Sequence, residues 1–242
     1  MFSPRALLAA GSQQHAEFLR TLAQIAAIWI VSDIGYYFLL PALGIQPNYN
    51  AGSIAITLYY VFWVGIAVIT FWPLYGRWTT DWATFENRLT SYIVWSAAFA
   101  GCTLFAAYVL PLLPPTKWTQ PFTQPEIRAA TPWYFLPKSV DILFQQLLIV
   151  ALVLSLSVQQ YSMRKIAGYC AVVFGGSHAL LALGDVPWPY VIRFMVAAAA
   201  FGAIFPHLIL RTRNGLAYSY VVHWLYYAIT IAMPRLFASA AQ

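Results

Sequence analysis

Two histidines lie inside long apolar segments and are the strongest candidates for chemistry in this sequence. His178 ends the stretch 172–178, and His223 lies within 220–224. Imidazole titrates near neutral pH, so it can act as a general base or as a metal ligand. Ionisable groups at bilayer depth are costly, usually face the interior of a helix bundle and often mark function. The sequence therefore predicts a site where these two segments meet.

A third polar group precedes them in the segment that begins near residue 138. Asp141 comes four residues before Gln145, which is followed by Gln146. On a helix this spacing puts Asp141 and Gln145 on one face, about 6 Å apart along the axis. Asp141 could act as a base through a bridging water, or it could pair with Lys138 or cap the helix. Both interpretations are open, and the structural one is favoured.

The composition identifies an integral membrane protein. Of the 242 residues, 61% are hydrophobic and 8% are charged, whereas a soluble domain carries roughly a quarter charged residues. The net charge of +6 comes from basic residues scattered through loops, which is typical of contact with lipid headgroups rather than with nucleic acid. Cys102 and Cys170 fall in apolar segments without disulfide or metal-ligand spacing.

Seven segments are long and apolar enough to span a bilayer, for which about 20 residues are needed. Lipid leaves only helices or closed barrels, and these segments are too long for barrel strands. The sequence therefore predicts an all-α membrane protein of about seven transmembrane helices. They are expected at 22–44, 53–75, 91–113, 138–158, 165–184, 189–211 and 215–237.

Basic residues predict the orientation of this bundle, because cytoplasmic loops carry an excess of Lys and Arg. The side that includes the N-terminus holds eight of them, and the opposite side holds five. We therefore expect a cytoplasmic N-terminus and an outside C-terminus. The eight are Arg5, Arg20, Arg77, Arg88, Arg164, Lys165, Arg211 and Arg213; the five are Lys117, Arg128, Lys138, Arg193 and Arg235.

One long loop separates the first three expected spans from the last four. It runs from Pro114 to Pro137, and its six prolines keep it from being helical throughout. Trp118 and Trp133 suit a position at the membrane interface. The loop could cover the bundle, but a solvated connector is the favoured interpretation. In the first span, Asp33 is expected to make a structural hydrogen bond, and most other aromatic residues are expected to face lipid or pack.

Three motifs recur at intervals typical of one family. Gln145-Gln146 is followed by Phe174-x-x-x-His178 and then by His223-x-x-x-Tyr227, with 201–216 between the last two. Segment 201–216 resembles the penultimate core helix and turn of the CAAX-protease and bacteriocin-processing (CPBP, or Abi) family of intramembrane proteases. The resemblance covers about 137–233. It implies a CPBP-like core of four helices in 137–242, which leaves the first three expected helices and the long Pro-rich loop in 1–136.

The chain departs from this family at the acidic positions. Phe174 and His178 match the family's second motif, and His223 matches the histidine of the third. Gln145 and Gln146 stand at the paired glutamates, and Val150 and Tyr227 stand at the arginine and the asparagine. The first glutamate is taken as the family's base, and glutamine cannot accept a proton from water. Losing a placed base typically costs about two to four orders of magnitude in rate.

The resemblance implies two functions. The first is an intramembrane metalloendopeptidase-like hydrolase that cleaves a membrane-anchored or prenylated protein near its C-terminus, in the bacterial inner (plasma) membrane. The second is a degenerate pseudoprotease that binds a hydrophobic or lipidated partner without cleavage. The catalytic candidates are His178, His223, Gln145, Asp141 and Tyr227. His178 and His223 are also the candidate ligands of a divalent metal such as zinc, although catalytic zinc usually has three protein ligands.

The expected depths of these groups in the bilayer differ. At about 1.5 Å per residue, Gln145 and His178 are expected about 9–12 Å below the outer boundary. His223 is expected about 18 Å below it, for a core of about 30 Å. They converge only if the last helix tilts or if the boundaries move by a turn.

Overall fold

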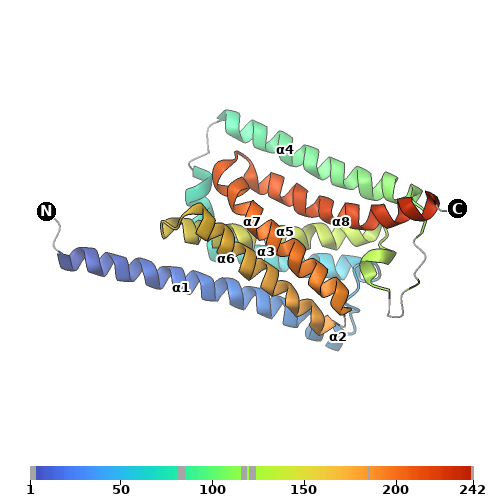
Figure 1. Ribbon diagram of the computed structural model, residues 1–242, viewed down its shortest axis with the longest axis horizontal. Coiled ribbons are helices and arrows are strands. Elements are labelled where there is room, and N and C mark those ends of the chain that lie inside the picture. Colours follow the sequence, from blue (N-terminus) through green and yellow to red (C-terminus); the bar gives the residue numbers. More distant parts are fainter. Residues whose placement is uncertain (1–3, 81–84, 116–118, 120–123, 185, 241–242) are drawn as a thin grey trace.

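The protein is all-helical in the residues that its computed structural model describes, which are 4–80, 85–115, 119, 124–184 and 186–240, and these residues contain no strand. The predicted fold class is thus confirmed at this level (Figure 1). The elements are α1 (Pro4–Ile34), η1 (Gly35–Leu39), α2 (Leu40–Ala42), α3 (Ser53–Thr80), α4 (Phe85–Leu104), η2 (Phe105–Val109), η3 (Leu110–Leu112), η4 (Glu126–Ala129), η5 (Pro132–Tyr134), α5 (Phe135–Val158), α6 (Met163–Ser177), η6 (His178–Gly184), α7 (Trp188–Arg211) and α8 (Gly215–Ala240).

Helix α5 forms the centre of the bundle. Every residue from Leu147 to Leu156 is buried, because α3 packs against α5 along its length and α1, α6, α7 and α8 also contact it. Helix α4 lies on the outside next to α8, and α1 runs along the other side of the bundle (Figure 1). A helix that is apolar all round is buried in this way.

Six helical segments of the described chain are long and apolar enough to cross a membrane, which fits an integral membrane protein. They are His15–Ala42, Ser53–Gly76, Arg88–Leu112, Pro132–Val158, Met163–Gly184 and Trp188–Arg211. The expected seventh segment forms α8, which does not belong to these six. Helix α8 carries Ser219, His223, Thr230 and Arg235, all buried, and polar side chains lower its mean hydropathy. Seven spans and the orientation remain predictions.

Helices α6 and α7 pack closely through small residues. A Cβ on Gly202 would overlap the Cys170 carbonyl oxygen, and it would lie 2.6 Å from the carbonyl carbon of Cys170 and 2.7 Å from the Cα of Ala171. A Cβ on Gly175 would meet the Cβ of Ala199 at 2.9 Å. Small residues let the backbones of membrane helices approach in this way. This packing fixes α6, and with it His178, against α7.

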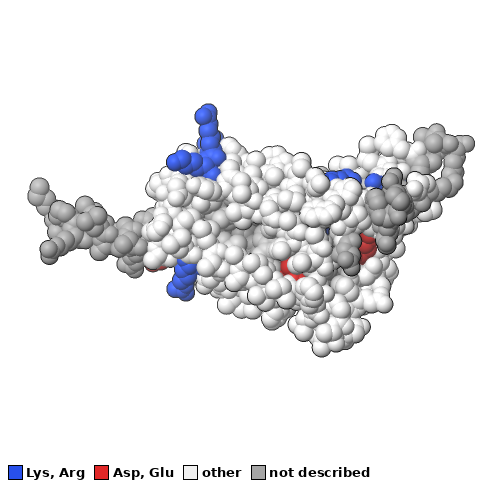
Figure 2. All heavy atoms as spheres, turned by 60° about the horizontal axis from the view of Figure 1, so that its bottom comes forward, with Lys and Arg blue, Asp and Glu red and all other residues white. Residues whose placement is uncertain are grey.

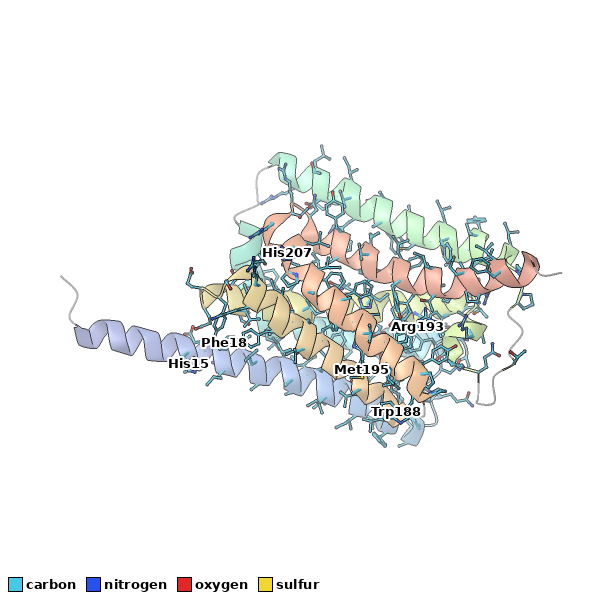
Figure 3. All side chains as sticks on the ribbon, viewed as in Figure 1. His15, Phe18, Trp188, Arg193, Met195 and His207 are labelled. Atoms are coloured by element: carbon cyan, nitrogen blue, oxygen red, sulfur yellow. The ribbon has the colours of Figure 1, made fainter. Side chains whose placement is uncertain are left out.

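Several connecting segments lie together at one end of the bundle, which we call the loop end and which comprises residues 43–52, 113–115 and 124–134 (Figure 1). Trp188 and Arg193 lie toward this end of α7, whereas His207 lies toward the opposite end, which His15 also marks (Figure 3). In Figure 2, basic side chains lie toward the two ends of the visible face, and most of the face between them is uncharged. This distribution suits a bundle whose middle lies in lipid.

The second half of the long loop folds onto the bundle, so the favoured interpretation as a solvated connector is wrong for this part. Ile127 and Ala130 are buried, and Glu126 Oε1 accepts a hydrogen bond from the Asn50 backbone N–H (2.9 Å). Trp133 is 60% exposed, as an interfacial tryptophan would be. Trp118 lies outside the described residues. This second half of the loop therefore covers the loop end of the bundle.

Candidate functional site

A cavity of about 540 Å³ opens at the loop end, between α1, α3, α5 and the turns that cover them. Its lining combines aromatic faces with ionisable and amide side chains. The lining residues are Asp33, Tyr36, Tyr37, Pro47, Asn48, Tyr49, Tyr60, Gln124, Pro125, Glu126, Ile127, Tyr134, Lys138, Asp141, Gln145, His178, Leu181, Gly184, Val186, Pro187, Phe194 and Tyr227. We call it the tyrosine cavity.

The Asp141 carboxylate in this cavity has three hydrogen-bond donors. Its Oδ2 accepts from Lys138 Nζ at 2.7 Å and from the Tyr49 hydroxyl at 3.0 Å. Its Oδ1 accepts from Gln145 Nε2 at 2.8 Å. Both oxygens are thus occupied, and Lys138–Asp141 is the only ion pair within the described residues. A water molecule or ligand that approaches Asp141 from the cavity thus meets a carboxylate already bonded by the protein's own donors.

Two tyrosine rings enclose the Lys138 ammonium. Its Nζ lies 4.5 Å from the ring centroid of Tyr49 and 4.5 Å from that of Tyr227. Cation–π contacts of this kind partly replace the water that the ammonium loses on burial. The pairing of Asp141 with Lys138, one of the structural interpretations of the sequence, is therefore confirmed. The pair lies in the protein interior rather than at its surface.

His178 begins the short 3₁₀ segment that follows α6. Its Nδ1 lies 2.8 Å from the Phe174 carbonyl oxygen, and because a carbonyl can only accept, Nδ1 carries the proton. Nε2 is then the unprotonated ring nitrogen. The side chain lines the tyrosine cavity and packs against the rings of Trp29 and Phe174. His178 can thus accept a proton or a hydrogen bond from a molecule in the cavity.

His223 lies behind the cavity rather than in its lining. Its Nδ1 lies 3.2 Å from Gln146 Nε2, so it accepts a hydrogen bond from that amide. Its ring packs against Phe174, Phe201 and Tyr227, and 2% of the residue is exposed. The helices of His178 and His223 do converge, since both rings contact Phe174, but solvent in the cavity meets only His178.

The structure thus brings together four of the five predicted catalytic residues. Asp141, Gln145, His178 and Tyr227 line one cavity, whereas His223 bonds to the neighbouring glutamine. That His178 and His223 bind a metal stays a prediction. Both histidines use Nδ1 in internal hydrogen bonds, and among the described residues no three His, Cys, Asp or Glu side chains converge to hold a metal.

The N-terminal half contributes side chains to the site that were not predicted from the sequence. Tyr36, Tyr49 and Tyr60 are buried around Asp141, although the aromatic residues of this half were expected to face lipid or to pack. The cavity is therefore lined by residues from both of the expected parts of the chain, 1–136 and 137–242. Asp33, expected to make only a structural bond, also lines it. Adjacent polar aromatics in apolar segments, as in Tyr36-Tyr37 and Tyr59-Tyr60, are the signal that could have identified this lining.

Glu126 gives the cavity an acidic group outside the membrane-spanning segments. Burial raises the pKa of its carboxyl from 4.5 to about 7, and the Asn50 backbone N–H and the Lys138 charge offset part of that rise. Because the folded-state pKa exceeds the unfolded one, the folded protein holds more protons between these two values. Its contribution to stability is therefore full below about pH 4.5 and is lost as the pH rises through about 7.

Replacing Glu126 with glutamine is expected to remove this pH dependence. The amide still accepts the Asn50 bond but cannot ionise, so Glu126→Gln should exceed wild type in the free energy of unfolding at pH 8 by roughly 1–3 kcal/mol. The two proteins should be equal near pH 4.5. Thermal unfolding of detergent-solubilised protein between pH 4.5 and 8.5 measures this, with the exposed Glu17→Gln as the control. A constant difference across this range would contradict the assignment.

Comparisons with protein-family models, with curated proteins and with solved structures find no match to this chain.

Proposed function

We propose that this protein is a membrane-embedded binding protein of degenerate CPBP type, which holds a hydrophobic or lipidated partner in the tyrosine cavity without cleaving it. The observation that carries the proposal is the state of Asp141. Asp141 is the acid of this cavity that lies one turn from Gln145, and it is paired with Lys138 and bonded to Tyr49 and Gln145. The cavity can hold a ligand, but the acid next to Gln145 is already held by the protein's own donors.

The size and lining of the cavity support a peptide-like or lipid-modified ligand. Its volume of about 540 Å³ lies within the range of roughly 300–1,000 Å³ typical of small-molecule sites. Tyrosine presents an apolar ring and a hydrogen-bonding hydroxyl together. Such a lining suits a chain with amide groups next to an apolar anchor. Gln145 Oε1 adds a buried acceptor that has no partner within the described residues.

Equilibrium binding of a lipidated peptide tests the proposal. The probe is a fluorescent farnesylated hexapeptide, compared with the same peptide lacking the farnesyl group, on protein in proteoliposomes. Leu181→Trp places a larger side chain in the cavity lining and so reduces the space for the ligand. It should raise Kd at least about tenfold, which is about 1.4 kcal/mol. Leu183→Trp is the matched control, because Leu183 is 47% exposed on the same 3₁₀ segment. Equal Kd values for the two variants would overturn the proposal.

A CAAX-protease-type endopeptidase is the second candidate, and one observation favours it. His178 and Asp141 line the same cavity, and the His178 tautomer leaves Nε2 free to take a proton from water. Tyr227 also lines the cavity and carries a hydroxyl that can donate to a developing oxyanion. In this case His178 is the base, and Asp141 remains paired with Lys138. No step requires a metal held by these residues.

A further inference from the structure

A second cavity, of about 450 Å³, lies at the loop end, and we call it the arginine cavity. It forms where η3 and the residues after it meet the η4 turn and the C-terminal part of α8. Gln124 is the single residue that lines both this cavity and the tyrosine cavity. The lining comprises Leu110, Pro111, Leu113, Pro115, Gln124, Arg128, Ala129, Ala130, Thr131, Pro132 and Arg235.

The lining of the arginine cavity is basic. Arg128 and Arg235 line it, and among the described residues no Asp or Glu is part of the lining. The nearest acid in sequence, Glu126, lines the tyrosine cavity instead. Neither arginine forms an ion pair within the described residues. The positive charge of this cavity is therefore not balanced by a carboxylate of its own lining.

Arg235 is 8% exposed and incompletely bonded, which points to a ligand. Its Nη2 donates to the Ala130 carbonyl oxygen at 2.6 Å, but its buried Nε has no partner within the described residues. Buried charged groups are normally paired, because leaving them alone is costly. Arg128 bonds through Nε to the Tyr190 hydroxyl at 3.0 Å, so the terminal nitrogens of its guanidinium are available to an anion.

The location of the cavity indicates the kind of anion. One candidate spanning segment ends at Leu112 and the next begins at Pro132, so the described residues between them, 113–115, 119 and 124–131, are expected at the level where a bilayer presents its headgroups. Arginine guanidinium groups bind phosphate through paired N–H donors. We propose that the arginine cavity binds the phosphate group of an anionic ligand, supplied either by a lipid headgroup or by free phosphate.

Binding of defined probes to the purified full-length protein in dodecyl maltoside tests this proposal. The probes are inorganic phosphate, dioctanoyl phosphatidylglycerol and dioctanoyl phosphatidylcholine, each titrated by calorimetry. The variants are Arg128→Gln and Arg235→Gln. Arg213→Gln is the matched control, because Arg213 is exposed and its segment 211–215 lies between α7 and α8, away from the loop end (Figure 1).

Wild type should bind phosphatidylglycerol or inorganic phosphate, and each cavity variant should weaken this binding at least about tenfold, while Arg213→Gln leaves it unchanged. If phosphatidylglycerol binds and inorganic phosphate does not, the ligand is a lipid headgroup. If inorganic phosphate binds and both arginine variants weaken its binding, the ligand is the free anion. Because Arg235 also holds Ala130, Arg128→Gln decides the result if Arg235→Gln does not fold. Absence of binding, phosphatidylcholine binding as tight as that of phosphatidylglycerol, or insensitivity to Arg128→Gln would overturn the proposal.

Discussion

Replacing Lys138 with methionine is expected to lower the free energy of unfolding by about 3–5 kcal/mol, because it leaves the Asp141 carboxylate buried without its cation. The pair is 2.7 Å apart, and the side chains are 9% and 5% exposed. Tyr49 and Gln145 still donate to Asp141 in this variant, but neutral donors do not balance its charge. The variant thus isolates the ionic part of the cluster.

The double variant Lys138→Met with Asp141→Asn should recover most of that loss. It removes both charges, and the asparagine can still accept the hydrogen bond from the Tyr49 hydroxyl. No uncompensated charge is then left buried. Chemical unfolding in detergent, followed by tryptophan fluorescence, measures all three proteins. Lys165→Met is the control, because Lys165 is exposed on α6 and surface changes usually stay within about 0.5 kcal/mol. A double variant as unstable as the single one would contradict the pairing.

Replacing Gly202 with alanine is expected to destabilise the protein by about 1–3 kcal/mol or more. The added Cβ meets the carbonyl group of Cys170 and the Cα of Ala171, and backbone atoms cannot move aside as a side-chain end can. Helices α6 and α7 must separate, which also displaces His178 from its position beside the cavity. The loss should therefore appear in stability and in peptide binding together.

Gly168→Ala provides the matched comparison for this change. Gly168 lies on α6, and a Cβ there meets nothing within 4 Å. Alanine is a better helix former than glycine by up to about 1 kcal/mol, so this variant should equal or exceed wild type. Thermal unfolding of the two variants under one set of conditions decides the matter. Similar losses in both would mean that glycine flexibility, not close packing, is what Gly202 provides.

The helical architecture could be predicted because lipid permits few alternatives. Long apolar segments must be helices, and six of the seven expected segments form helices of sufficient length and apolarity. The partner of Asp141 was also accessible, since Lys138 precedes it by three residues and such pairs are neighbours on a helix. Local spacing was enough in both cases.

The rest of the site could not be predicted, because it depends on contacts distant in sequence. Tyr49 bonds to Asp141 across 92 residues, and Asn50 bonds to Glu126 across 76. No local pattern specifies such pairs. His223 was expected in the cavity because of its motif. Instead its Nδ1 bonds to the Gln146 amide, and the residue lies outside the cavity lining.

Cleavage of a membrane-anchored reporter by the purified protein in proteoliposomes tests the central claim most directly. We predict that wild type leaves the reporter intact at every pH between 5 and 9, because Asp141, the acid one turn from Gln145 in this cavity, is held by Lys138. Gln145→Glu, which adds a carboxylate one turn from Asp141 in the cavity lining, is the variant in which cleavage could arise. Cleavage by wild type that His178→Ala abolishes would contradict the account and establish an endopeptidase.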